Sequence, residues 1–102
     1  DPFAFHALVA GAQGCFWGAV NAMPRQAVEL YDLVLAGQAS EAAELWKRML
    51  PANLFFWTHP YNPAVKAATN ILVNKVGPCR LPVQPLSDAE LRELDIALQP
   101  LR

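Results

Sequence analysis

Two histidines are the first candidates for chemistry in this chain, because imidazole can exchange protons near neutral pH. His6 lies in an expected N-terminal helix, and His59 lies in a turn beside Trp57 and Pro60. No serine, cysteine or carboxylate close to His59 in the sequence completes a catalytic triad. We therefore expect a surface position for His6 and a structural position at a rim for His59.

Three lysines, Lys47, Lys66 and Lys75, raise the question of Schiff-base chemistry, which needs an amine whose pKa is lowered by an apolar pocket. Lys66 has the most apolar context, Ala-Val-Lys-Ala-Ala. A lysine in the first turns of a helix usually extends its amine to solvent. We therefore predict no catalytic residue among the lysines.

Metal and phosphate sites are not predicted either. Cys15 and Cys79 are far apart and have no partner at zinc-ligand spacing, so we expect free thiols in a reducing compartment. The Gly-Ala-Gln-Gly stretch at residues 11–14 lacks the lysine and hydroxyl of a phosphate-binding loop. The expectation is no metal and no cofactor.

A pocket-lining role is most attractive at residues 14–21, where glycines bracket Phe16 and Trp17. Glycines allow close approach of the backbone to a ligand, and α/β barrels keep their sites at the ends of buried strands. The alternative, that both aromatic residues are core residues, is equally compatible with the pattern. We take Phe16 and Trp17 as candidate substrate-binding residues.

Composition narrows the class of protein. The chain has 102 residues, of which 54% are apolar and 17% charged, and its formal net charge is −1. This excludes a disordered segment and gives no support to nucleic-acid or acidic-lipid binding. No signal peptide and no apolar run long enough to cross a membrane is visible, which predicts a cytoplasmic protein. The apolar excess predicts a surface that packs against a partner.

Periodicity predicts a mostly helical chain with one short buried strand at 14–18. Because a strand must pair and the chain offers no second one, these residues read as the tail of a larger sheet-containing fold. The first expected helix covers residues 1–10, with Asp1 as its cap, and the second begins at Pro24 and is ended by Gly37. The third begins at Gln38 and either kinks or stops at Pro51, and the fourth begins at Pro63 and is closed by Gly77. The last helix follows the capping box of Ser87 and Glu90.

Four motifs in order resemble the C-terminal third of the dihydrodipicolinate synthase / N-acetylneuraminate lyase family. They are G-A-Q-G-C-F-W-G-A-V-N (11–21), A-G-Q-A-S-E-A (36–42), N-P-A-V-K-A-A (62–68) and R-L-P-V-Q-P-L-S (80–87). The resemblance implies an α/β fold, the C-terminal part of a (β/α)8 TIM barrel. Residues 1–36 would be the end of the barrel, with its last strand and helix, and residues 37–102 a helical C-terminal extension.

The resemblance also implies a class I, Schiff-base aldolase, lyase or synthase acting on pyruvate or a related 2-oxo acid. The family's Schiff-base lysine and proton-relaying tyrosine would lie upstream of Asp1, and Lys66 matches a lysine of the extension. Phe16 falls where the family places an apolar residue beside the 2-oxo acid. Trp17 departs from the usual small or hydroxyl residue, which favours a substrate other than that of the lysine-biosynthetic synthase, and Asn21 matches a frequent structural asparagine.

The family resemblance further implies a homo-oligomer, a tetramer or dimer, without nucleic-acid or membrane partners. The alternative is a stand-alone helical interaction module without catalytic activity. That alternative predicts that the 102 residues fold cooperatively alone, against which stands the unpaired strand expected at 14–18.

Overall fold

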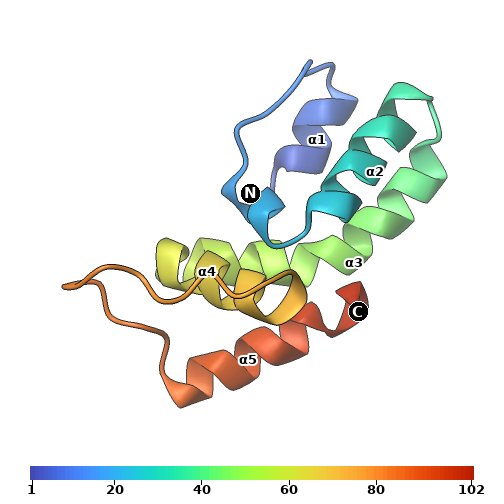
Figure 1. Ribbon diagram of the computed structural model, residues 1–102. Coiled ribbons are helices and arrows are strands. Elements are labelled where there is room, and N and C mark those ends of the chain that lie inside the picture. Colours follow the sequence, from blue (N-terminus) through green and yellow to red (C-terminus); the bar gives the residue numbers. More distant parts are fainter.

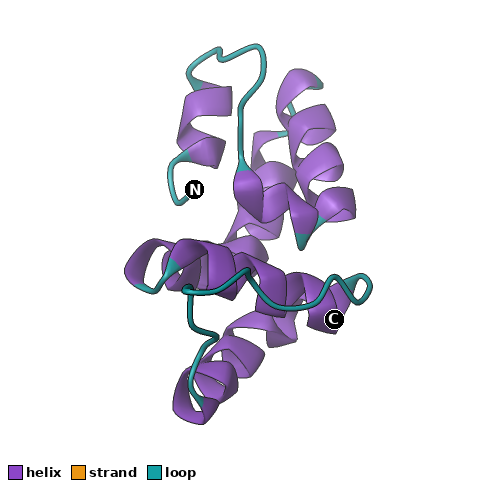
Figure 2. Ribbon diagram, turned by 60° about the vertical axis from the view of Figure 1, so that its left-hand side comes forward, coloured by secondary structure: helices purple, strands orange, loops and turns teal.

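A computed structural model describes residues 1–102, and every regular element in it is a helix (Figures 1 and 2). The α-helices are α1 (Ala4–Val9), α2 (Pro24–Leu35), α3 (Ala39–Thr58), α4 (Tyr61–Leu72) and α5 (Asp88–Leu98); two short 3-10 helices are η1 (Gly18–Asn21) and η2 (Gln99–Leu101). The molecule is elongated, with extents of 43 × 23 × 23 Å. None of its helices combines the length and apolar character that a membrane-spanning segment needs.

Helix α3 is the central helix of the fold and contacts α2, α4 and α5 (Figure 1). Its apolar residues recur at helical spacing and are buried along one face: Ala42, Leu45, Trp46, Met49, Ala52, Phe55 and Phe56. Pro51 lies inside the helix on its exposed side, and α3 continues through it to Thr58. Of the two alternatives expected at Pro51, the stop is excluded, because α3 and its buried face continue on both sides of the proline.

Helices α1 and α2 pack at the N-terminal half of α3 (Figure 1). Pro24 occupies the first turn of α2, as predicted, where its missing N–H costs nothing. Gly37 has φ 73°, a conformation that suits glycine and ends α2 before α3 begins. Phe5 of α1 stacks on Trp46 of α3 with ring centroids 5.9 Å apart, so α1 packs directly on α3.

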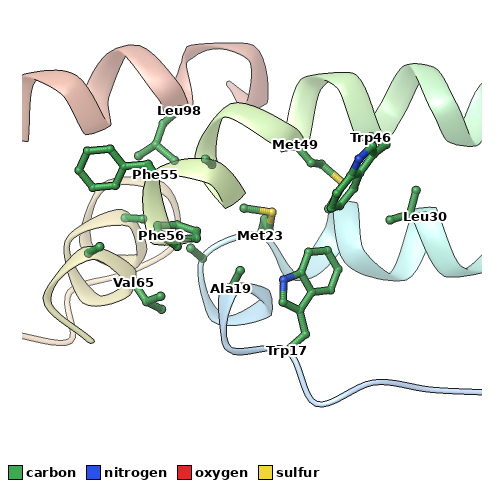
Figure 3. Close-up of a cluster of buried hydrophobic side chains, with 14 of the residues drawn as sticks. Trp17, Ala19, Met23, Leu30, Trp46, Met49, Phe55, Phe56, Val65 and Leu98 are labelled. Atoms are coloured by element: carbon green, nitrogen blue, oxygen red, sulfur yellow. The ribbon is translucent and has the colours of Figure 1, made fainter. Parts of the chain in front are cut away.

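Helices α4 and α5 pack at the other half of α3, and the chain doubles back along α4 before it reaches α5 (Figure 1). The predicted capping box is confirmed: Ser87 Oγ accepts from Glu90 N at 3.2 Å, and Glu90 Oε2 accepts from Ser87 N at 3.4 Å. One cluster of buried apolar side chains joins both halves, and Met23, Met49 and Phe56 lie near its centre (Figure 3).

Residues 13–17 form no strand within this chain, and Gly18 begins η1 (Figure 2); the strand predicted at 14–18 would pair with strands outside these residues and stays a prediction. Trp17 does have extended backbone angles, φ −140° and ψ 102°. An extended segment becomes a strand only when a neighbouring backbone takes its hydrogen bonds. No second extended segment of these 102 residues lies beside it.

Two helices also differ from the sequence-based expectation in where they begin or end. Helix α1 begins at Ala4 and has no side-chain cap, so the proposed cap by Asp1 is wrong. Helix α4 begins at Tyr61 after Pro60 and ends at Leu72, well before Gly77. The Asn70 side chain explains the early end, because its Oδ1 accepts from the backbone N–H of Val76 at 2.7 Å and of Gly77 at 3.2 Å, holding these residues in a turn outside the helix.

Candidate functional site

Phe16 and Trp17, the candidate substrate-binding residues, have opposite environments. The Phe16 side chain is fully exposed, whereas Trp17 is 8% exposed and lies among the helices (Figure 3). This follows from the extended backbone, in which successive side chains point to opposite sides. The structure therefore does not bring the two side chains together, and Trp17 occupies the core position that the sequence left open as an alternative.

Asn53 holds Trp17 in place. The indole Nε1–H donates to Asn53 Oδ1 at 3.1 Å, and Asn53 Nδ2 donates to the carbonyl of Met49 at 2.9 Å. Asn53 is completely buried on the inner face of α3, so these bonds satisfy a polar group that would otherwise be costly. Sequence reasoning missed this residue, although an asparagine at an inward position between Met49 and Phe56 was a usable signal.

Tyr61, the first residue of α4, lies against the backbone of η1. A Cβ atom on Gly18 would come within 2.4 Å of the Tyr61 hydroxyl, so this close approach needs glycine. Burial raises the pKa of Tyr61, and hydrogen bonding from the backbone of Ala19 and Gly18 acts in the opposite direction. Asn21 closes η1 by donating from Nδ2 to the carbonyl of Gly18 at 2.9 Å. This agrees with the structural role expected for Asn21.

A groove of about 590 Å³ opens between η1, α4 and the segment 73–87, which follows α4. We call it the α4 groove. Its lining residues are Gly18, Asn21, Tyr61, Asn62, Val65, Lys66, Thr69, Val76, Cys79, Arg80 and Val83. They include two cationic side chains and no carboxylate. Lys66 donates from Nζ to the carbonyl of Pro78 at 3.1 Å, and neither Lys66 nor Arg80 forms an ion pair.

The histidines lie where the sequence predicted. His6 is exposed on α1. His59 ends α3, with Nε2 3.2 Å from Glu93 Oε2 of α5 and its ring stacked on Phe55 at 3.7 Å between centroids. His59 thus links two helices, and its Nδ1 also lies 3.1 Å from the hydroxyl of Thr58 and 3.0 Å from the carbonyl of Phe55. Both cysteines are free thiols, and no group of three histidine, cysteine or acidic side chains is arranged to hold a metal ion.

Comparison with known proteins defines the class to which this arrangement belongs. Residues 1–101 match the model of the dihydrodipicolinate synthetase family. The chain is 32% identical over 100 residues to 4-hydroxy-tetrahydrodipicolinate synthase 1 of Halalkalibacterium halodurans and 34% identical over 98 residues to 4-hydroxy-tetrahydrodipicolinate synthase of Limosilactobacillus reuteri. These matches cover 98% and 96% of this chain, and 34% and 32% of the relatives.

The fold comparison agrees with the sequence comparison. The crystal structure of a proposed dihydrodipicolinate synthetase from Pseudomonas aeruginosa superimposes with a TM-score of 0.88 and 37% identity, over 99% of this chain and 35% of that one. The chain belongs to the dihydrodipicolinate synthetase family and corresponds to the C-terminal part of its TIM-barrel fold. It spans about a third of the length of the relatives that it matches.

Proposed function

We propose that these residues are the C-terminal part of a class I, Schiff-base aldolase, lyase or synthase that acts on pyruvate or a related 2-oxo acid. The observation that carries this proposal is the family match over residues 1–101, together with relatives that are synthases. In this proposal residues 1–36 complete the barrel and residues 37–102 form its helical extension. The Schiff-base lysine and the proton-relaying tyrosine belong to residues that precede Asp1.

Phe16 and Trp17 have separate roles in the proposed pocket wall. Phe16 contacts the 2-oxo acid, since its side chain is free to face a barrel interior. Trp17 does not contact the substrate in this proposal; its hydrogen bond to Asn53 fixes the position of the backbone that carries Phe16. Replacing Phe16 by alanine should raise KM for the 2-oxo acid, whereas Phe3→Ala, at an exposed phenylalanine of the N-terminal turn, should not. Equal kinetics of the two variants would contradict the role of Phe16.

Borohydride reduction in the presence of pyruvate tests the chemistry in the natural-length protein. A Schiff base between a lysine amine and the keto group is reduced to a stable secondary amine, which peptide mass spectrometry can assign. We expect one pyruvate adduct, on a lysine outside these 102 residues, and none on Lys47, Lys66 or Lys75. An adduct on one of these three lysines, or no adduct at all, would contradict the proposal.

The proposed enzyme is a homo-oligomer, a tetramer or dimer, located in the cytoplasm. Support comes from exposed apolar side chains on several elements, such as Val28, Leu35 and Trp57, which a barrel or a second subunit would cover. Light scattering of the natural-length protein should give the mass of a dimer or tetramer. A monomer at micromolar concentration would contradict this part of the proposal.

One observation favours the second candidate, a helical interaction module without activity. The helices share one core cluster, and the segment at 14–17 contributes Trp17 to it. If the module exists, the isolated polypeptide should melt cooperatively and stay monomeric. Aggregation of the isolated polypeptide, or a gradual loss of helix without a cooperative transition, would exclude it.

A further inference from the structure

We propose that the α4 groove binds a small organic acid, with Arg80 and Lys66 holding its carboxylate groups. The inference uses residues of this chain alone and does not require the Schiff-base chemistry proposed above. Three features support it: the shape of the groove, its charge and the chemical mixture of its walls.

The shape suits a small molecule. A second hollow of about 310 Å³ adjoins the α4 groove, and Lys66 and Cys79 line both. Pockets that bind small ligands generally have volumes of about 300–1,000 Å³. The walls come from rigid or tethered parts of the chain, since Asn70 fixes the turn at Val76 and Gly77, and Lys66 bonds to Pro78.

The charge selects an anion. Neither hollow is lined by aspartate or glutamate, although the chain as a whole has a net charge of −1. The carboxylates that form ion pairs elsewhere, Glu44, Glu93 and Asp95, all bond to other partners. Arg80 therefore has its guanidinium donors free for a ligand, and a guanidinium matches the two oxygens of a carboxylate in a forked pair.

The walls select an organic rather than an inorganic anion. Val65, Val76 and Val83 supply apolar surface in the same groove as the two cations, which suits a short carbon chain. The amide of Asn62 and the hydroxyl of Tyr61 add neutral polar groups on the same side as η1. A dicarboxylic acid of a few carbons combines these requirements.

Succinate is the probe for the binding test in the natural-length protein, because it has no keto group for a lysine amine to attack. Succinate binding can therefore fail while pyruvate still forms a Schiff base, and the reverse can also occur, so the two proposals are tested separately. We expect succinate binding by calorimetry, weakened about tenfold or more by Arg80→Gln and by Lys66→Gln, because each removes a charge-assisted bond. The matched controls Arg92→Gln and Lys75→Gln, at exposed positions outside both hollows, should bind as the wild type does.

A second measurement, the rate of cysteine alkylation, uses the wild-type protein and therefore tests the proposal even if Arg80→Gln does not fold. Cys79 lines the groove, whereas Cys15 is exposed outside it. Succinate at about ten times its Kd should slow alkylation of Cys79 about tenfold by occupying the groove, and leave Cys15 unchanged. The proposal would be overturned if Cys79 is alkylated at the same rate with and without succinate. It would also be overturned if Arg80→Gln and Arg92→Gln bind succinate equally, or if the protein binds phosphate but not succinate.

Discussion

The indole N–H of Trp17 donates to Asn53 Oδ1 across 3.1 Å in the centre of the fold. The two residues are far apart in the chain and both are buried. The bond joins the exposed segment before η1 to the middle of α3, and so connects the candidate pocket residue Phe16 to the helical core.

Asn53→Leu should lower the free energy of unfolding by about 1–3 kcal/mol, because the Trp17 N–H would then be buried without an acceptor. Urea denaturation followed by circular dichroism gives this value. Asn74→Ala is the matched control, since Asn74 is exposed and should change stability by less than about 0.5 kcal/mol. Equal effects of the two substitutions would mean that the Trp17–Asn53 bond contributes nothing.

Gly18→Ala should be destabilising by about 1–3 kcal/mol, because the new methyl group would overlap the Tyr61 hydroxyl and ring. Gly14→Ala is the control, since no atom lies within 4 Å of a Cβ atom at that position. Adding Tyr61→Phe to Gly18→Ala should recover part of the loss by removing the hydroxyl. If the double variant is as unstable as the two single losses added together, the contact is not the cause.

Tyr61 should make the stability of the fold depend on pH in the alkaline range. Burial raises its pKa in the folded state above the ordinary value of 10.0, so the folded state disfavours the phenolate. The contribution of Tyr61 is fully present below pH 10.0 and is lost as the pH rises through the higher, folded-state pKa. The wild type should lose unfolding free energy relative to Tyr61→Phe as the pH rises above 10.0, because phenylalanine does not titrate. Parallel pH curves would contradict this prediction.

Ser87→Ala should cost about 0.5–2 kcal/mol, because it removes the acceptor for the Glu90 amide at the start of α5. Ser40→Ala provides the comparison, since Ser40 is exposed in the first turn of α3 and caps nothing. Thermal unfolding should show a clear drop in Tm for the first variant and little change for the second. The same Tm for both would show that the capping box is dispensable.

Local chemistry made several features predictable from the sequence. The start of α2 at Pro24, its end at Gly37 and the capping box of Ser87 and Glu90 depend on conformations that those residue types favour by themselves. The family motifs likewise lie in the sequence, and the match over residues 1–101 confirms them. The free thiols agree with the wide separation of Cys15 and Cys79 in the sequence, whereas the contact of His59 with Glu93 depends on how α5 packs on α3.

Features that depend on distant partners were decided by the tertiary structure. The segment at 14–18 has strand-like composition, but it lacks a neighbouring backbone within these residues and leads into η1 instead. Which of Phe16 and Trp17 is buried depends on Asn53 of α3, and the closeness of Gly18 to Tyr61 depends on how α4 packs on η1. Periodicity and local residue types therefore predicted the helices, and the motifs indicated the family. Packing between helices determined the groove and the side chains that line it, because those contacts join residues that are remote in sequence.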